Sequence, residues 1–195
     1  GLNESKRKGK KSLMTDKFGN KYEIDIQVED KNHNPLVLIE TKWLRYKKHN
    51  RDKASWVCTA HYSLRKTYPS IKKTMVVLSG NWSKTSLDLM RSFGIEIHYI
   101  PYITVSKIFA DSDINFDWSE KDRGTATLAW NKFNDLSPKQ MKILAQSVTD
   151  SIKYSVKSSL RNTLSEKRSR SISEIEITIK SNLGEYFNQD FKTLD

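Results

Sequence analysis

Short apolar runs, each bounded by turn-forming residues, dominate the first half of the chain. Residues 11–16 and 21–29 flank the turn sequence Lys17-Phe18-Gly19-Asn20, so we predict a β-hairpin. Residues 30–35 are dense in turn formers and lead into a strand at 36–42, which extends the hairpin to a three-stranded meander. The last strand is apolar at odd and even positions alike, which is typical of a strand buried on both faces.

A helix is predicted next, from Asp52 as the N-cap to about residue 67. Its apolar positions have helical spacing and are expected to face the core: Trp56, Val57, Ala60 and Leu64. Its other face carries Lys53, His61 and Arg65, which are expected to be exposed, to line a nucleic-acid groove or to assist at the site discussed below.

Strand and helix patterns then alternate. A buried strand at 74–78 precedes a short helix that Ser83 caps and Gly94 ends, and an alternating strand follows at 95–100. Strands that alternate with helices imply parallel pairings, so we predict an α/β fold with a mixed central sheet flanked by helices.

The character of the sequence changes after Pro101, where a polar, helix-rich region begins. Ser137-Pro138 starts a long helix that runs to about Arg161. Its apolar stripe is expected to dock on the core or to meet its copy in a homodimer: Leu144, Val148, Ile152, Val156 and Leu160. A basic connector at 167–171 and a C-terminal β-hairpin follow. We therefore divide the chain into a basic flexible segment (1–10), a core (11–101) and a helical extension with a hairpin (102–195), the extension being a candidate for dimerisation or nucleic-acid binding.

Composition narrows the class of protein. The 195 residues carry a formal net charge of +11, from 34 basic and 23 acidic residues. There is no apolar stretch of the about 20 residues that span a bilayer and no signal peptide, so we expect a cytoplasmic protein without a membrane partner. Gly1 stands in the place of an initiator methionine, which indicates a fragment or a processed chain. The single cysteine, Cys58, and four scattered histidines exclude a disulfide framework and a zinc-type ligand cluster.

Two acidic residues and one lysine stand out on the predicted strands. Glu40-Thr41-Lys42 closes the buried strand, and Asp25 lies in the second arm of the hairpin. Side chains alternate along a strand, so Glu40 and Lys42 face the same way, and a neighbouring strand can bring Asp25 beside them. Two carboxylates and an ammonium at one sheet edge suit metal-assisted phosphodiester hydrolysis.

A purely structural interpretation of this motif stays open. Glu-x-Lys occurs twice more, at Glu4 and Glu29, so the tripeptide by itself carries no information. A charge at the end of a buried strand must be paired or bind a metal, and a salt bridge between Glu40 and Lys42 would satisfy that need without a metal.

An Asp followed by a turn and an apolar strand ending in Glu-x-Lys resembles the PD-(D/E)xK nuclease superfamily. This superfamily includes restriction endonucleases, Mrr-like enzymes and archaeal Holliday junction resolvases. The resemblance covers residues 11–101 and implies a restriction endonuclease-like core. It departs from the family pattern at Ile24, which precedes Asp25 where the family has proline.

The resemblance also implies a cofactor and the residues of the site. It makes Asp25, Glu40 and Lys42 the catalytic residues, with Mg²⁺ held by Asp25, Glu40 and the Thr41 carbonyl, and with Mn²⁺ as a substitute. Lys42 would hold the attacking water and stabilise the transition state. Two further carboxylates are candidate accessories: Glu23, on the strand face of Asp25, and Glu4, because the family often supplies a glutamate from an N-terminal helix.

Basic and aromatic residues follow the motif and suit a polyanionic partner. The candidate nucleic-acid-binding residues are Trp43, Arg45, Lys47, Lys48, Arg51, Lys53 and Arg65. We therefore expect a Mg²⁺-dependent endonuclease that hydrolyses DNA, of the restriction type, with RNA as a second potential substrate. The sequence leaves open three alternatives: a structure-specific nuclease of the junction-resolvase kind, a regulated nuclease module of a larger effector, and a non-catalytic nucleic-acid-binding domain.

Overall fold

The computed structural model describes residues 11–165, 172 and 174–192. The chain divides into two compact units, Gly1–Leu164 and Ser165–Asp195. The expected flexible segment at 1–10, the candidate Glu4 and the basic connector at 167–171 lie outside the described residues. No helix of the described part is long and apolar enough to cross a membrane.

The first unit begins with a two-stranded antiparallel hairpin, β1 (Ser12–Thr15) and β2 (Lys21–Ile24). Its turn contains Gly19 at φ 86°, a conformation that glycine adopts without strain. The chain then bends at Asp25 and continues as β3 (Ile26–Glu29), which pairs with a different strand. The prediction of one continuous arm at 21–29, and with it a three-stranded meander, is therefore wrong.

Burial explains why the bend occurs. Tyr22 and Ile24 are buried against helix α1 (Asn50–Thr67), whereas Ile26, the next residue of the same parity, is 47% exposed. The inward face of the chain thus changes at Asp25, because β2 and β3 belong to two separate sheets. The bend leaves the Asp25 side chain free to turn towards the neighbouring strand.

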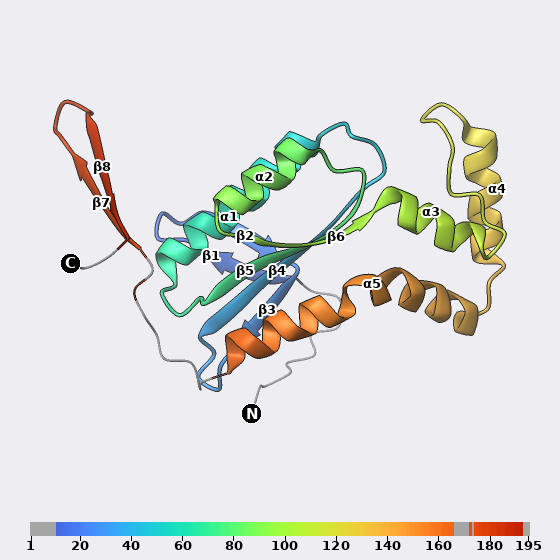
Figure 1. The fold of residues 1–195 in the computed structure, drawn as a ribbon, viewed down its shortest axis with the longest axis horizontal. Helices are drawn as coiled ribbons and strands as arrows, with labels where there is room; N and C mark the ends of the chain where they lie inside the picture. The colour runs from blue at the N-terminus through green and yellow to red at the C-terminus, as the bar shows by residue number, and fades with distance from the viewer. Residues whose placement is uncertain (1–10, 166–171, 173, 193–195) are drawn as a thin grey trace. The chain divides into compact units, whose positions relative to one another are not determined.

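The central sheet has four strands in the order β3-β4-β5-β6, with β4 at Pro35–Leu44, β5 at Lys73–Gly80 and β6 at Glu96–Pro101. The β3–β4 pair is antiparallel, and the β4–β5 and β5–β6 pairs are parallel. This confirms the prediction of an α/β fold with a mixed central sheet (Figure 1). The strand expected to be buried on both faces is β4, where Val37 and Leu38 are both fully buried.

Helices cover the two faces of this sheet (Figure 1). On one face, α1 (Asn50–Thr67) and α2 (Lys84–Ser92) enclose a cluster that includes Val57, Leu78 and Met90. On the other face, α3 (Tyr102–Ala110) and α5 (Pro138–Leu164) pack on residues of β4 to β6. The first unit is therefore a three-layer structure with β4 and β5 at its centre.

Helix α1 differs from its prediction in where it begins and in which residues it buries. It begins at Asn50 with His49 as N-cap at φ 65°, so Asp52 lies in the first turn and is not the cap. Trp56 is 52% exposed, against the predicted apolar stripe, and His61 is 1% exposed, against the predicted polar face. Cys58 lies on this helix and has a free and buried thiol.

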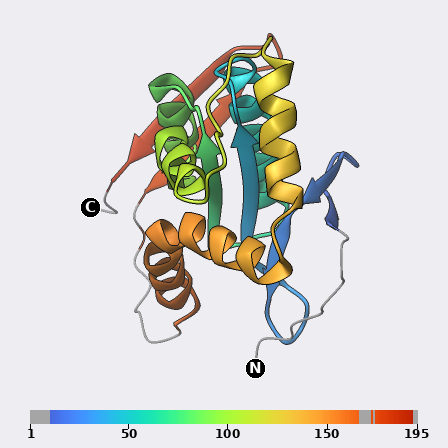
Figure 2. The same cartoon turned by 90° about the vertical axis from the view of Figure 1, so that its right-hand side faces the viewer.

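The long helix α5 packs within its own unit. Leu160 and Leu164 contact the cluster of Val37, Ile39 and Met75, and its middle turns contact Ile100 and Val105. Its first turns meet α3 and α4 (Arg123–Asn134) at the end of the unit, which Figure 2 shows from that side. The boundary expected at residue 102 therefore falls inside the first compact unit.

The second unit contains the C-terminal hairpin that was predicted, with strands β7 (Ile175–Lys180) and β8 (Tyr186–Phe191) in antiparallel register. Ile175 pairs with Phe191 and Ile179 with Phe187, so one face of the hairpin carries large apolar side chains. Both strands are largely exposed within this unit.

Candidate functional site

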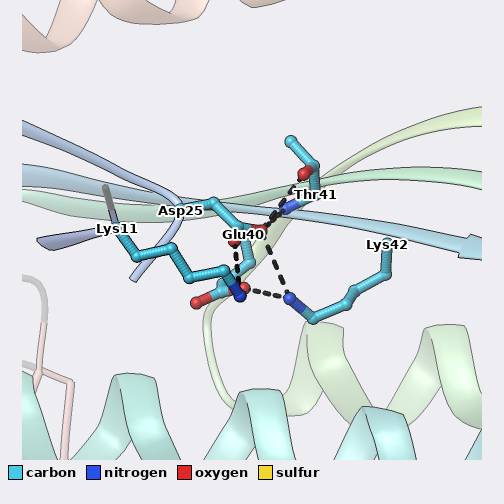
Figure 3. A network of polar contacts seen from close by, with 5 residues as sticks. All are labelled: Lys11, Asp25, Glu40, Thr41 and Lys42. Carbon is cyan, nitrogen blue, oxygen red and sulfur yellow. Dashed lines mark hydrogen bonds and ion pairs between the residues drawn. The ribbon is translucent and has the colours of Figure 1, made fainter. Parts of the chain in front are cut away.

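The three residues of the sequence motif lie together at the edge of β4 (Figure 3). Glu40 and Lys42 project from the same face of β4, and Lys42 Nζ forms an ion pair with Glu40 Oε2. The same ammonium lies 3.3 Å from Asp25 Oδ2. One cation therefore joins two carboxylates that are far apart in the sequence, as predicted. These side chains are mostly buried, with Glu40 only 3% exposed, Asp25 15% and Lys42 19%.

Thr41 fixes the orientation of Asp25. Its backbone N–H donates to Asp25 Oδ2 over 2.8 Å, and its hydroxyl donates to the same oxygen over 3.1 Å. The register explains the first bond: β3 stops pairing with β4 at Ile26 and Ile39, so the Thr41 N–H has no strand partner on that side. The carboxylate at the bend replaces the missing strand, because a backbone donor without a partner is costly.

The two carboxylates have opposite pKa shifts. Burial raises the pKa of Glu40 above its usual range, and the adjacent Asp25 raises it further, against the opposing effect of Lys42. Burial also acts to raise the pKa of Asp25, but the Thr41 N–H, Glu40 and the cations of Lys11 and Lys42 outweigh it and lower that pKa. Such a pair titrates as a coupled unit in which Asp25 loses its proton first.

Lys11 is a fourth member of the site that sequence reasoning missed. Its ammonium lies 3.1 Å from Asp25 Oδ1, whereas Lys42 contacts Oδ2. A hydrogen bond to Asp25 and the charge of that residue raise the pKa of Lys11. No signal in the sequence distinguishes Lys11 from the other basic residues near it, because its proximity depends on the pairing of β1 with β2 and on the bend at Asp25.

The accessory carboxylate Glu23 is exposed on β2 and makes no hydrogen bond or ion pair with Asp25, Glu40 or Lys42. The bend separates it from Asp25, so the two residues do not share one regular strand. Glu23 is near enough to Lys11 for its charge to raise the pKa of that lysine.

A divalent cation is compatible with these residues. Within the described part of the chain, no group of three or more His, Cys, Asp or Glu side chains is placed to hold a metal ion. Mg²⁺ does not need such a group, since it keeps several waters and often uses one or two carboxylates together with substrate phosphates. Asp25 and Glu40 already share one cation, the Lys42 ammonium, and their oxygens are the hard donors that Mg²⁺ prefers. In a strand the C=O and N–H of one residue face the same side, so the Thr41 carbonyl faces the side of Asp25.

His61, expected on the polar face of α1, is instead buried near the site. It lies on the face of α1 turned towards the sheet, and neither ring nitrogen has a hydrogen-bond partner among the described residues. Burial, with smaller effects from the charges of Lys42 and Arg65, lowers the pKa of His61 to about 4. A histidine with that pKa is neutral at physiological pH.

The candidate nucleic-acid-binding residues differ in their surroundings. Four of them are exposed in the connection from β4 to α1 and in its first turn, namely Lys47, Lys48, Arg51 and Lys53. Trp43 is 42% exposed, but its ring also packs on Tyr102 and Phe116. Arg65 is exposed on α1 and donates to the Phe93 carbonyl over 3.4 Å. These residues therefore lie on β4, in the connection from β4 to α1, and on α1.

Arg45 has a different environment from the exposed lysines. Its guanidinium lies over the Trp118 ring, 3.4 Å from the centroid, and donates to the carbonyls of Phe116 and Trp118. Arg45 thus fastens the end of β4 to the loop that follows α3. Its Nε and Nη2 donate within the protein, so Arg45 can offer an anion its charge more than free hydrogen-bond donors.

A scan against models of known protein families finds no match, and no curated protein is significantly similar to the chain. The resemblance to the PD-(D/E)xK superfamily therefore depends on the motif residues and their arrangement alone.

Proposed function

We propose that the protein is a metal-dependent nuclease with a restriction endonuclease-like core, whose substrate is DNA. The observation that carries this proposal is the convergence of Asp25 and Glu40 on one ammonium, that of Lys42. A structural salt bridge needs one carboxylate and one lysine, whereas here two largely buried carboxylates meet at one ammonium, and Asp25 is held in place by Thr41 and by a second cation, Lys11. Bringing like charges together out of water is costly, and such clusters are typical of functional sites.

Each residue of the site has a chemical role under this proposal. Asp25, ionised by its low pKa, and Glu40 would hold the divalent cation, with the Thr41 carbonyl facing the same side. When bound, such a cation lowers the pKa of a water and offsets charge on the phosphate. Lys42 would position the attacking water and donate to the phosphate oxygen on which charge develops. Lys11 contacts Asp25 Oδ1 and adds a second positive charge at the site.

DNA is proposed as the substrate because of charge. The chain has a net charge of +11, and exposed lysines and arginine follow directly after the motif. Positive charge beside a reactive centre concentrates a polyanion there and releases counterions when the polyanion binds. Cleavage of the restriction type at fixed sites is our first choice. The alternatives are cleavage at branched junctions and a role as the nuclease module of a larger, regulated protein. A comparison of plasmid with branched DNA as substrate separates cleavage at fixed sites from cleavage at junctions.

The experiment is a cleavage assay on supercoiled plasmid, branched DNA and RNA, with Mg²⁺, with Mn²⁺ and with a chelator. We expect the wild-type protein to cut DNA when either metal is present and to be inactive in the chelator. Lys42→Ala should lower the rate by about 100-fold or more, as the loss of one transition-state donor does elsewhere. Lys73→Ala is the matched control, because Lys73 forms a comparable half-buried ion pair with Glu96, 2.6 Å away, in the same sheet.

Two outcomes would contradict the proposal. Equal rates for wild type and Lys42→Ala would remove the catalytic role of the motif. Tight DNA binding by the wild type without any cleavage, in the presence of either metal, would favour the non-catalytic nucleic-acid-binding domain instead.

A further inference from the structure

The first unit contains a cavity that the proposed cleavage site does not use. It has a volume of about 340 Å³ and lies between Arg45 at the end of β4, the loop after α3, and α4. Besides Arg45, five aromatic residues from three segments line it: Phe109, Phe116, Trp118, Trp130 and Phe133. The remaining lining residues are small or aliphatic, so the wall is apolar except for one guanidinium.

The aromatic rings of the cavity wall pack on one another in two sets, one in α3 and the loop after it, the other on α4. Phe109 and Phe116 pack with centroids 4.5 Å apart, and Trp118 meets Phe116 edge-on at 5.4 Å. Trp130, on α4, stacks near Phe133 at 6.3 Å and is 63% exposed. A large, exposed tryptophan at the mouth of an apolar cavity presents a flat face to a ligand.

The apolar, aromatic wall and its single positive charge indicate the kind of ligand that would fit. Aromatic pockets often bind cations, but the positive charge of Arg45 inside this wall disfavours a cationic ligand. The volume is at the lower end of the range for small-molecule pockets, which suits one ring system better than a long chain. Proteins hold unpaired bases by stacking them on aromatic side chains beside positive charge. A planar base attached to an anionic backbone or phosphate fits both features.

The position of the cavity separates it from the cleavage chemistry. Side chains alternate along β4, so Trp43 lies on the face opposite to Glu40 and Lys42, where it packs on Phe116 of the cavity wall. Arg45 follows Lys42 by three residues, which is about 10 Å along a strand.

We propose that this cavity is a binding site for one unpaired nucleobase, taken either from the DNA substrate or from a free nucleotide. The DNA source rests on the proposed function, whereas the nucleotide source does not. Trp130 stacks on the base, and Arg45 supplies positive charge near the phosphate that the base carries.

The test uses the full chain in chelator, so that no cleavage is required. Affinities are measured for a fully paired duplex and for the same duplex with one unpaired base. The variants are Trp130→Ala and, as a matched control, Trp56→Ala, which removes a similarly exposed tryptophan from α1, away from the cavity. Because both side chains are more than half exposed, we expect both variants to keep the wild-type circular dichroism spectrum.

If the base comes from DNA, the wild type binds the duplex with the unpaired base more tightly than the paired duplex. Trp130→Ala then loses about 5- to 150-fold in affinity for it, which corresponds to about 1–3 kcal/mol per stacked base, and Trp56→Ala keeps the wild-type preference. In a second arm, dAMP and dCMP are titrated while the indole N–H signals of Trp118 and Trp130 are followed by NMR. Shifts of these signals without a preference among duplexes identify a free nucleotide as the ligand.

Two results overturn the proposal. One is the same affinity of wild type and Trp130→Ala for the duplex with the unpaired base, together with unmoved indole signals. The other is that Trp130→Ala loses the same affinity for both duplexes while the indole signals do not move. Trp130 would then contact DNA without distinguishing an unpaired base. A protein that binds the base but does not cut DNA would refute the nuclease proposal alone.

Discussion

Acidification should destabilise the protein through His61. The folded pKa of His61 is about 4, whereas the pKa of a histidine in an unfolded chain is 6.5, because burial and nearby Lys42 and Arg65 disfavour the charged ring. Between these values the unfolded chain binds a proton that the folded chain does not. Stability is therefore fully present above pH 6.5 and is lost as the pH falls towards 4.

The size of the effect follows from the same two values. A difference of about 2.5 pKa units at 1.36 kcal/mol per unit gives about 3 kcal/mol in all. Most of it is lost between about pH 7.5 and about pH 4.5. His61→Leu removes the titrating group while it keeps an apolar side chain in a buried position where neither ring nitrogen has a described partner. This variant should be close to the wild type in stability at neutral pH, because no hydrogen bond is lost.

The assay is urea unfolding of wild type and His61→Leu at about pH 7.5 and at about pH 4.5. The wild type should lose about 2–3 kcal/mol more than the variant on acidification. His33→Asn is the control: it changes an exposed histidine at φ 64° to a residue that tolerates this conformation, and it should follow the wild type. If wild type and His61→Leu lose the same stability, the burial of a neutral histidine beside Lys42 is refuted.

Two further predictions concern the packing around β4 and α1. Gly80→Ala should destabilise the fold by about 3 kcal/mol or more, measured by urea unfolding, because Gly80 is at φ 99° and an added Cβ would lie 2.0 Å from the Leu44 carbonyl oxygen. Unchanged stability would show that the ends of β4 and β5 are not so close. Burial raises the pKa of Cys58 to about 11, so its thiol should react with a disulfide reagent near pH 8 only after denaturant is added. Rapid reaction in native conditions would contradict this burial.

The strand that carries the motif could be predicted because its pattern is local. An uninterrupted apolar run followed by Glu40-Thr41-Lys42 identifies a strand buried on both faces, and Val37 and Leu38 are fully buried in the structure. The N-cap of α2 could be predicted in the same way. Ser83 was expected to cap this helix, and its side chain accepts a hydrogen bond from the Ser86 N–H. That Asp25 would meet Glu40 and Lys42 was predicted from the alternation of strand side chains, and the structure brings them together.

The bend and the partners that depend on it could not be predicted. Ile24 and Ile26 continue the alternation through Asp25, although the first is buried and the second is exposed in a different sheet. The position of Lys11 depends on that bend, so no local pattern shows it. His61 was assigned to the polar face because histidine is usually hydrated, whereas tertiary packing buries it and leaves the amphipathic Trp56 at the surface.

The most direct test of the central claim is the dependence of plasmid cleavage on Mg²⁺ in wild type, Glu40→Gln and Glu96→Gln. Glutamine keeps the shape of Glu40 but not its charge, so a carboxylate that holds a divalent cation cannot be replaced by it. We predict Mg²⁺-dependent cleavage by wild type and by Glu96→Gln, whose carboxylate pairs with Lys73 elsewhere in the sheet, and a loss of about 100-fold or more in Glu40→Gln. Cleavage by Glu40→Gln at the wild-type rate, or no cleavage by the wild type at any Mg²⁺ concentration, would contradict the account.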